Sequence, residues 1–359
     1  MSAAGLRVGV LGATGAVGST ILEVLAERRF PVSELRAFAS ERSVGRQVPW
    51  AGDGAAGTGA VGADGTVTCQ ALTEDSIQGL DLVISSAGGS VSAEWAPRLV
   101  EAGAVVVDNT SYWRMQEGVP LVIPEVNPTA ADAHRGIVAN PNCSTMQMVM
   151  ALAPLHREVG LRRLVVSTYQ SVSGTGQKAI EELREQSAAV LAGEPVPQPQ
   201  VYPHQVAFNA LPQVESFKEG DDYTTEERKM MAETRKILGL GERDLAISAT
   251  CVRVPVFNAH SESVNVETEK ALTPERCREI LSAAPGVIVV DNPQETIYPL
   301  AINAAGRDEV LVGRIRRDPG REDCLNLWVV GDNLRKGAAT NAVQVAELLV
   351  ERDLVGRRA

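Results

Sequence analysis

The stretch Leu6-Arg7-Val8-Gly9-Val10-Leu11-Gly12-Ala13-Thr14-Gly15-Ala16-Val17-Gly18 decides how the first part of this chain folds. Its beginning is mostly apolar and predicts a strand, and the residues from Ser19 to Arg29 predict a helix. A glycine-rich turn between a strand and a helix is typical of dinucleotide binding, because the backbone can approach a pyrophosphate that faces the helix N-terminus. A glycine-rich connection without a ligand is the alternative. We predict that Gly12, Gly15 and their neighbours bind a nucleotide.

A second strand, Leu35–Ala39, bears on which nucleotide is bound. An enzyme that uses NAD usually has an acid at the end of this strand, where it binds the ribose hydroxyls. Here the strand is followed by Ser40, Arg42 and Ser43, which suit the 2′-phosphate of NADP. Glu41 leaves NAD open as the alternative. We predict NADP as the cofactor.

Strands and helices continue to alternate along the first part of the chain. Asp81–Ser85 predicts a strand, Val91–Ala102 a helix and Ala104–Asp108 another strand. This alternation predicts a parallel, doubly wound sheet of the α/β class. The run Ala51–Gly65, rich in glycine and alanine, predicts a flexible surface loop.

The pattern changes near Asn140, where longer segments rich in β-branched residues predict an α+β domain. We predict one domain from residues 1–139, joined by a C-terminal helix at about 338–359, and a second from 140–337. The predicted strands of the second domain are Leu164–Val172, Leu245–Val254 and Ser263–Thr268, and its predicted helices are Thr175–Leu191 and Thr224–Leu238.

Composition excludes several classes of function. The chain has 359 residues, of which 44% are hydrophobic and 22% charged, as in ordinary globular proteins of two domains. The net charge of −11 argues against nucleic acid or an anionic membrane as partner. No run approaches the roughly 18 apolar residues of a membrane span. The predicted strand near the N-terminus leaves no room for a signal peptide.

Cysteine and histidine spacing argues against a metal site. The five cysteines are widely spaced without a C-x-x-C pair, and the four histidines form no H-x-x-x-H pattern. A disulfide framework or a structural zinc site is therefore not expected. We predict a reduced, cytoplasmic protein without a metal.

Cys143 is the candidate nucleophile. It lies in Asn140-Pro141-Asn142-Cys143-Ser144-Thr145, before an apolar run that predicts a helix. Pro141 favours an extended residue before it, and Asn142 is a good helix cap. Cys143 is then at a helix N-terminus, which favours the thiolate and lowers a thiol pKa. The alternative is a small buried thiol at a turn.

Other polar residues interrupt apolar patterns and are further candidates. Arg114 follows a predicted strand, Gln170 lies within one, and Glu226 and Lys229 share a helix face. When each of these residues is considered alone, a structural role or an exposed position is the more common explanation.

The segment Arg253-Val254-Pro255-Val256-Phe257-Asn258-Ala259-His260 is the second strong motif. It predicts a strand that carries an arginine, bends at a proline and ends at a histidine in a turn. The guanidinium of Arg253 suits bidentate binding of a carboxylate, and His260 suits proton transfer to or from the thiol. A lone histidine is more often structural.

Together these motifs resemble the bacterial aspartate-β-semialdehyde dehydrogenase family over nearly the whole chain. The resemblance implies a Rossmann-type NADP-binding domain and a catalytic and dimerisation domain that forms a homodimer. The motifs that carry it are Gly12 to Gly18, Ser40 to Gly45, Asn140 to Thr145, Gln170 to Gly174, Arg253 to Val256 with His260, and Asp332-Asn333-Leu334-Arg335-Lys336-Gly337-Ala338-Ala339.

The family's functional residues transfer to matching positions of this chain. The resemblance implies that Cys143 is the nucleophile and His260 the acid and base, and Asn142 is a candidate to hold an oxyanion. It implies substrate binding by Gln170, Glu226 and Arg253, and phosphate binding by Arg114 and Lys229. It also implies that NADP contacts Thr14, Gly15, Ala16, Val17, Arg42, Ser43, Ser173, Gly174 and Asn333.

The activity implied is reduction of L-aspartyl-4-phosphate to L-aspartate-4-semialdehyde through a thioester, in lysine, threonine and methionine biosynthesis. One alternative is N-acetyl-γ-glutamyl-phosphate reductase, which has the same thiol chemistry but needs no acid for a free ammonium. Another is a non-catalytic nucleotide sensor with an unreactive Cys143.

Overall fold

The computed structural model describes residues 5–52 and 65–356, and most of the predicted loop 51–65 lies outside these ranges. The chain divides into two compact units. The first is Met1–Pro141 with Ala338–Ala359, and the second is Asn142–Gly337.

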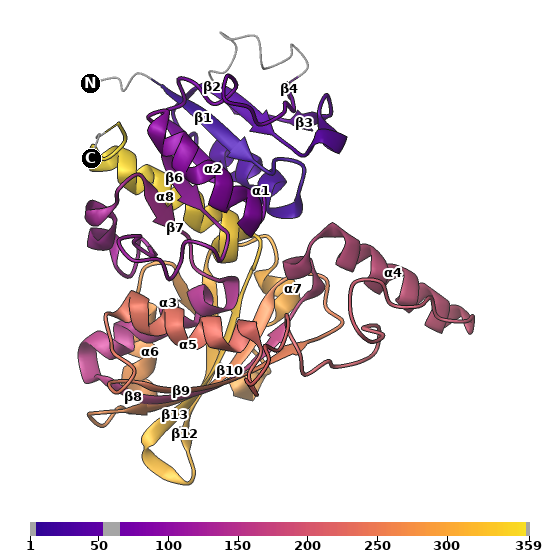
Figure 1. The fold of residues 1–359 in the computed structure, drawn as a ribbon. Helices are drawn as coiled ribbons and strands as arrows, with labels where there is room; N and C mark the ends of the chain where they lie inside the picture. The colour runs from indigo at the N-terminus through magenta and orange to yellow at the C-terminus, as the bar shows by residue number, and fades with distance from the viewer. Residues whose placement is uncertain (1–4, 53–64, 357–359) are drawn as a thin grey trace. The chain divides into compact units, whose positions relative to one another are not determined.

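The first unit contains a five-stranded sheet of order β2-β1-β5-β6-β7 in which all neighbouring strands are parallel. This confirms the predicted doubly wound sheet (Figure 1). Its elements are β1 (Leu6–Leu11), α1 (Ala16–Glu27), β2 (Val32–Phe38), β3 (Gln47–Pro49), β4 (Thr66–Thr68), β5 (Leu82–Ser85), α2 (Gly89–Glu101), β6 (Val105–Asp108), β7 (Ile137–Ala139) and α8 (Thr340–Glu351).

Two glycines shape the turn between β1 and α1. Gly12 has a φ of +78°, and a Cβ there would lie 2.6 Å from the carbonyl oxygen of Ser86. A Cβ on Gly18 would lie 2.0 Å from the carbonyl oxygen of Gly12. Side chains at either position are therefore excluded by backbone atoms. The helix begins at Ala16, earlier than the predicted Ser19, because the turn is tighter than the sequence pattern shows.

The C-terminal helix α8 completes the core of the first unit. Its buried Val343 and Leu349 belong to the same apolar cluster as Ile21 of α1. At its start, the side-chain amide of Asn341 donates to the carbonyl of Val122 at 2.9 Å. Helix α8 therefore belongs to the first unit, although it follows the whole second unit in the sequence.

The second unit contains a six-stranded mixed sheet of order β11-β12-β13-β10-β8-β9. Helices α3, α5 and α6 lie on one face of it (Figure 1). The predicted α+β class of the second domain is confirmed. The elements are α3 (Cys143–Val159), β8 (Leu161–Gln170), α4 (Gln177–Ala192), α5 (Thr225–Leu238), β9 (Ala246–Arg253), β10 (His260–Thr268), α6 (Pro274–Ser282), β11 (Val287–Val289), α7 (Ala301–Ala304), β12 (Val310–Asp318) and β13 (Arg321–Gly331).

The strand β10 corrects the sequence prediction. The prediction placed His260 in a turn and began the strand at Ser263, but the strand begins at His260 itself. His260 and Glu262 are fully buried on one face of the strand, and alternate residues of a strand share a face. A strand with polar residues at its buried positions lacks the alternation of apolar and polar residues by which strands are predicted from sequence.

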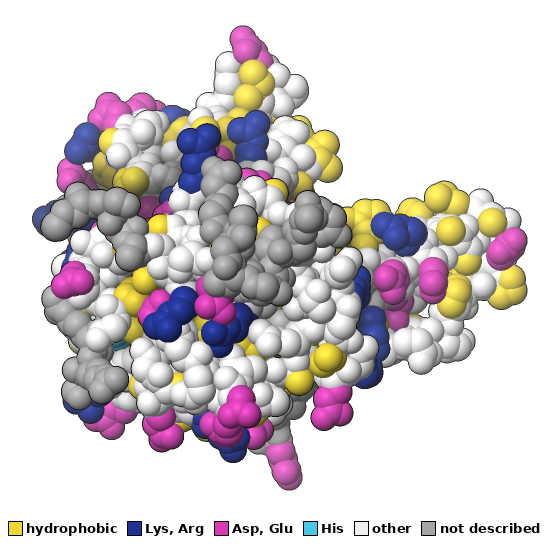
Figure 2. Space-filling model, turned by 90° about the horizontal axis from the view of Figure 1, so that it is seen from above, with side chains coloured by type: hydrophobic (Ala, Val, Ile, Leu, Met, Phe, Trp, Pro, Cys, Tyr) yellow, Lys and Arg dark blue, Asp and Glu magenta, His cyan; other side chains and the backbone are white. Residues whose placement is uncertain are grey.

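Helix α4 extends away from the sheet of the second unit (Figure 1). Apolar side chains are visible on this projecting helix in Figure 2, and Val190 and Leu191 near its end are 37% and 79% exposed. None of the helices that the structure describes is long and apolar enough to cross a membrane.

Candidate active site

Cys143 is the first residue of α3, as predicted. The side-chain oxygen of Asn142 caps the helix by accepting from the backbone N–H groups of Ser144 and Thr145, at 3.0 and 3.2 Å. The sulfur thus lies where the helix dipole stabilises negative charge. The sequence signal was local, because cap and capped residues are neighbours in the chain.

Asn142 is further fixed by two carboxylates of α5. Its backbone N–H donates to Glu233 at 2.7 Å, and its side-chain amide donates to both oxygens of Glu226 at 3.0 and 3.1 Å. Both donor groups of Asn142 are engaged, so holding an oxyanion would require one of these hydrogen bonds to break. Glu233 was not predicted as a site residue, since it is a helix glutamate 91 positions away.

His260 lies within reach of the sulfur. Its Nε2 is 3.4 Å from Sγ of Cys143. Its Nδ1 accepts a hydrogen bond from the backbone N–H of Ser171 at 3.0 Å. A backbone N–H can only donate, so Nδ1 carries no proton and the neutral ring carries its proton on Nε2. The structure therefore selects the tautomer that donates toward the sulfur.

The electrostatic setting keeps this imidazole neutral. Complete burial lowers the pKa of His260 well below its usual value, and the charge of Arg253 lowers it further. A protonated ring would also bring an N–H at Nδ1 against the N–H of Ser171. A negatively charged sulfur is therefore stabilised by the helix start and a neutral hydrogen-bond donor, rather than by an imidazolium.

A polar cluster holds the segment that precedes His260. The side-chain oxygen of Asn333 accepts from the backbone N–H of Ala259 at 3.0 Å and from the hydroxyl of Ser171 at 3.0 Å. Ala259 has a φ of +70°, a conformation that costs a non-glycine residue roughly 1–2 kcal/mol. Asn333 and Ser173, predicted cofactor contacts, also bond to each other at 2.9 Å. The hydrogen bonds of Asn333 within the second unit therefore hold Ala259, the residue before His260, in place.

Arg253, at the end of β9, has a free donor. Its Nη1 donates to the carbonyl of Ser171 at 2.6 Å, and its guanidinium lies over the ring of Tyr202. Its Nε has no hydrogen-bond partner among the described residues, although the side chain is only 5% exposed. A Cβ on Gly174 would lie 3.3 Å from the His260 ring and 3.6 Å from Nη1 of Arg253. The unused donor and the glycine beside it suit an anionic ligand.

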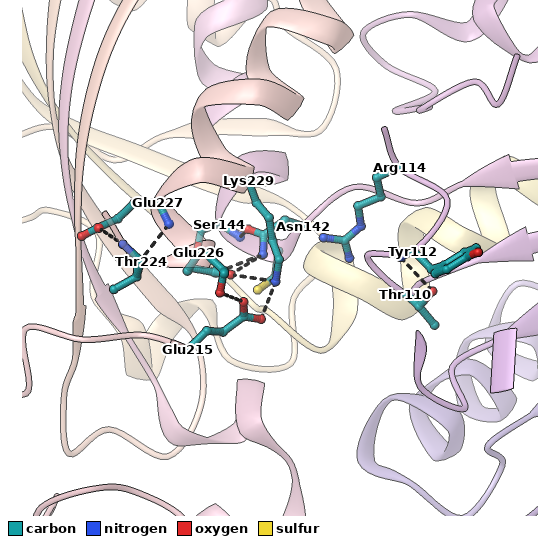
Figure 3. A network of polar contacts seen from close by, with 12 residues as sticks. Thr110, Tyr112, Arg114, Asn142, Ser144, Glu215, Thr224, Glu226, Glu227 and Lys229 are labelled. Atoms are coloured by element: carbon teal, nitrogen blue, oxygen red, sulfur yellow. Dashed lines mark hydrogen bonds and ion pairs between the residues drawn. The ribbon is translucent and has the colours of Figure 1, made fainter. Parts of the chain in front are cut away.

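Gln170, Glu226 and Lys229 form a second polar group at the site. Figure 3 shows Glu226 and Lys229 beside Asn142 and Ser144. The amide of Gln170 donates to Ser144 Oγ at 2.7 Å and to Glu226 at 3.1 Å. Lys229 lies 3.5 Å from Glu226, which confirms that the two share a helix face. Glu226 is buried rather than solvated.

Arg114 belongs to the first unit, in the turns after β6. Its Nε donates to the carbonyl of Asn140 at 2.9 Å and its Nη2 to the carbonyl of Asn109 at 2.8 Å. The side chain is buried. The predicted joint role with Lys229 in phosphate binding stays a prediction.

The nucleotide turn of the first unit fits an anionic ligand. Among the described residues no side chain caps helix α1, and its first turn contains no acid, which favours an anion at its N-terminus. Ser40, Arg42 and Ser43 follow β2 in and beside a short 3-10 helix, Glu41–Ser43. Glu41 and Arg42 are both exposed there.

These features define the class of protein. Residues 7–134 match the family described as semialdehyde dehydrogenase, NAD binding domain, and residues 152–336 match semialdehyde dehydrogenase, dimerisation domain. The chain thus belongs to the semialdehyde dehydrogenases, a class of oxidoreductases with an NAD-binding domain.

Individual relatives narrow the family. An aspartate-semialdehyde dehydrogenase of Aquifex aeolicus is 54% identical over 98% of this chain and 100% of its own, and one of Bacillus subtilis is 45% identical over 98% and 99%. The structure of the Vibrio cholerae aspartate semialdehyde dehydrogenase II complexed with ASA is 45% identical over 97% and 98%, with a TM-score of 0.90. This chain belongs to the aspartate-semialdehyde dehydrogenase family. The N-acetyl-γ-glutamyl-phosphate reductase alternative is therefore wrong at the level of the family.

Proposed function

We propose that this chain reduces L-aspartyl-4-phosphate to L-aspartate-4-semialdehyde with NADPH, and catalyses the reverse reaction with phosphate and NADP, in lysine, threonine and methionine biosynthesis. One observation carries the proposal most directly. A thiol at a helix N-terminus lies 3.4 Å from a histidine nitrogen that bears a proton. This pair suits covalent catalysis through a thioester.

Cys143 and His260 have different roles in the proposed reaction. The Cys143 thiolate attacks the acyl phosphate, phosphate leaves, and a thioester remains on Sγ. Bound NADPH supplies the hydride for the reduction. His260 donates a hydrogen bond from its Nε2–H to the sulfur and so stabilises the thiolate that leaves when the thiohemiacetal oxyanion becomes the aldehyde. In the reverse direction the same N–H stabilises the thiolate that attacks the aldehyde.

Substrate orientation follows from the charges around the thiol. We assign the α-carboxylate to Arg253, whose Nε is unused, and the ammonium to the buried carboxylate of Glu226. Gln170 fixes Glu226 and adds a further polar contact. We assign the phosphate to Lys229 and, from the family resemblance, to Arg114.

We propose NADP rather than NAD as the preferred cofactor. The serines and arginine that follow β2 suit a 2′-phosphate, and a related aspartate semialdehyde dehydrogenase from Candida albicans was solved with NADP. That structure is 25% identical over 98% of this chain, with a TM-score of 0.73. Glu41, beside Arg42, could instead bind the ribose hydroxyls of NAD, so activity should be measured with both NADP and NAD.

We propose that the protein acts as a homodimer. The second unit matches a dimerisation domain, and the sheet face away from α3 carries Tyr169 and Trp328, whose rings lie 5.4 Å apart. Tyr169 is partly exposed despite its size. A second copy would cover these rings.

We also propose a cytoplasmic location. The five cysteines all lie in the part of the chain that the structure describes, and they form no disulfide there, as expected in a compartment that keeps thiols reduced.

The decisive test is a phosphate-dependent assay of NADP reduction with L-aspartate-4-semialdehyde, repeated with NAD. Cys143→Ser should lose nearly all turnover yet still bind NADP, whereas Cys324→Ser, which changes a buried thiol on β13, should keep it. Near-wild-type turnover of Cys143→Ser would refute the covalent mechanism. Slow alkylation of Cys143 at neutral pH, without turnover, would support the nucleotide sensor instead.

A further inference from the structure

Lys229 forms ion pairs with two carboxylates. Its Nζ pairs with Oε1 of Glu215 and lies 3.5 Å from Oε2 of Glu226 (Figure 3). The cluster therefore holds one positive and two negative formal charges. Inorganic phosphate that binds Lys229 while no substrate ammonium pairs with Glu226 would meet an excess of negative charge unless one carboxylate moves away.

The two carboxylates are held very differently. Glu226 is 4% exposed, accepts hydrogen bonds from Asn142 and Gln170, and lies 3.5 Å from Nζ of Lys229. Glu215 is 43% exposed, and its second oxygen accepts from the hydroxyl of Thr225 at 2.6 Å. Displacing Glu226 would break a buried network, whereas Glu215 can exchange with solvent.

The backbone aims Glu215 at the lysine. Glu215 has a φ of +63°, which a non-glycine residue adopts only under constraint. The neighbouring Ser216 accepts a backbone hydrogen bond from Thr225 at 2.9 Å, which ties this segment to the start of α5. A strained residue with its carboxylate on a cation points to a functional contact.

We propose that Glu215 occupies the anion-binding position of Lys229 and is displaced by inorganic phosphate or by the phosphate group of the substrate. This inference rests on the proposed function, which assigns phosphate to Lys229. Glu215 then sets the affinity for phosphate, because every phosphate that binds must replace an existing ion pair.

The competing interpretation is that Glu215 only positions Lys229 and stays in place when phosphate binds. The two interpretations predict opposite effects of removing the charge. Loss of a competitor strengthens phosphate binding, whereas loss of a positioning group weakens it.

The test is an equilibrium titration of the full-length enzyme with inorganic phosphate. Glu215→Gln should lower the dissociation constant by about 1.5-fold to fivefold, the range that an exposed ion pair contributes. Glu215→Gly should do the same and also fold well, because its φ of +63° suits glycine. Glu219→Gln, which changes an exposed acid of the same segment, should match the wild type.

A double-mutant cycle shows whether the effect passes through the lysine. In a Lys229→Met background, Glu215→Gln should leave phosphate binding unchanged. An equal gain in both backgrounds, or unchanged or weaker binding in the single variant, would overturn the inference. Turnover separates this result from the proposed function. If the wild-type enzyme requires phosphate for semialdehyde oxidation, the proposed function stands whatever Glu215→Gln does.

Discussion

Gly337 lies against the nucleophile, and replacing it with alanine should damage catalysis more than folding. A Cβ at this position would lie 3.0 Å from Cβ and 3.4 Å from Cα of Cys143, and 3.2 Å from the carbonyl oxygen of Asp332. Apolar carbon atoms in good contact are about 3.5–4.0 Å apart. Cys143 or the π-helix Arg335–Ala339 must therefore shift by several tenths of an ångström.

The size of the effect follows from that shift. Overpacking of this kind typically costs about 1–3 kcal/mol of stability. Catalysis is more sensitive, because a misplacement of about 1 Å can cost about a hundredfold in rate. The Sγ–Nε2 distance of 3.4 Å is ordinary for a hydrogen bond to sulfur, and a retreat of Cys143 by several tenths of an ångström would lengthen and weaken it. We expect Gly337→Ala to lower kcat by about tenfold to a hundredfold.

The assay is phosphate-dependent NADP reduction, with urea unfolding and the rate of Cys143 alkylation measured in parallel. Gly320→Ala is the matched control, because a Cβ there would meet only the Asp318 side chain, at 3.5 Å. A variant that unfolds only slightly more easily but turns over slowly would support the reasoning. A kcat and an alkylation rate equal to those of wild type would refute it, since they would mean that Cys143 has room to move without consequence.

Two further predictions concern buried charges. Arg253→Lys should raise KM for the semialdehyde by about tenfold to a hundredfold, because lysine does not reproduce the planar pair of donors; an unchanged KM would remove Arg253 from the carboxylate site. Burial raises the pKa of Glu262 well above its usual value, so the folded protein keeps a proton that the unfolded chain releases above about pH 4.3. The free energy of unfolding then falls as pH rises, and Glu262→Gln should reduce that fall between about pH 5 and about pH 8 in urea titrations. Identical pH slopes would show that the folded protein ionises Glu262.

Local features of the site could be predicted from the sequence. The turn of Gly12 and Gly18, the cap at Asn142 and the shared face of Glu226 and Lys229 each involve residues within one or two helical turns. Their geometry follows from backbone sterics and helix periodicity, which a single sequence displays.

Contacts between distant segments could not be predicted in the same way. Gly337 touches Cys143, and Asn333 fixes Ala259, only because β13 lies beside β10 and the chain then passes the start of α3. The sequence motif around Asn333 was recognised, but as part of a cofactor site. Its hydrogen bonds show that it also holds the residue before His260.

The buried carboxylates of α5 explain how the reactive thiol is positioned. Glu226 and Glu233 both accept from Asn142, the residue before Cys143, while Glu227 accepts from the backbone N–H of Cys251 on β9 at 2.9 Å. A buried carboxylate is tolerated only when donors surround it, so each of these contacts resists displacement. Helix α5 thereby fixes the start of α3 to the edge of the sheet. The same helix carries Lys229 one turn from Glu226. The residue proposed to bind the leaving phosphate is therefore held on the same helix as the residue that anchors Asn142 beside the nucleophile.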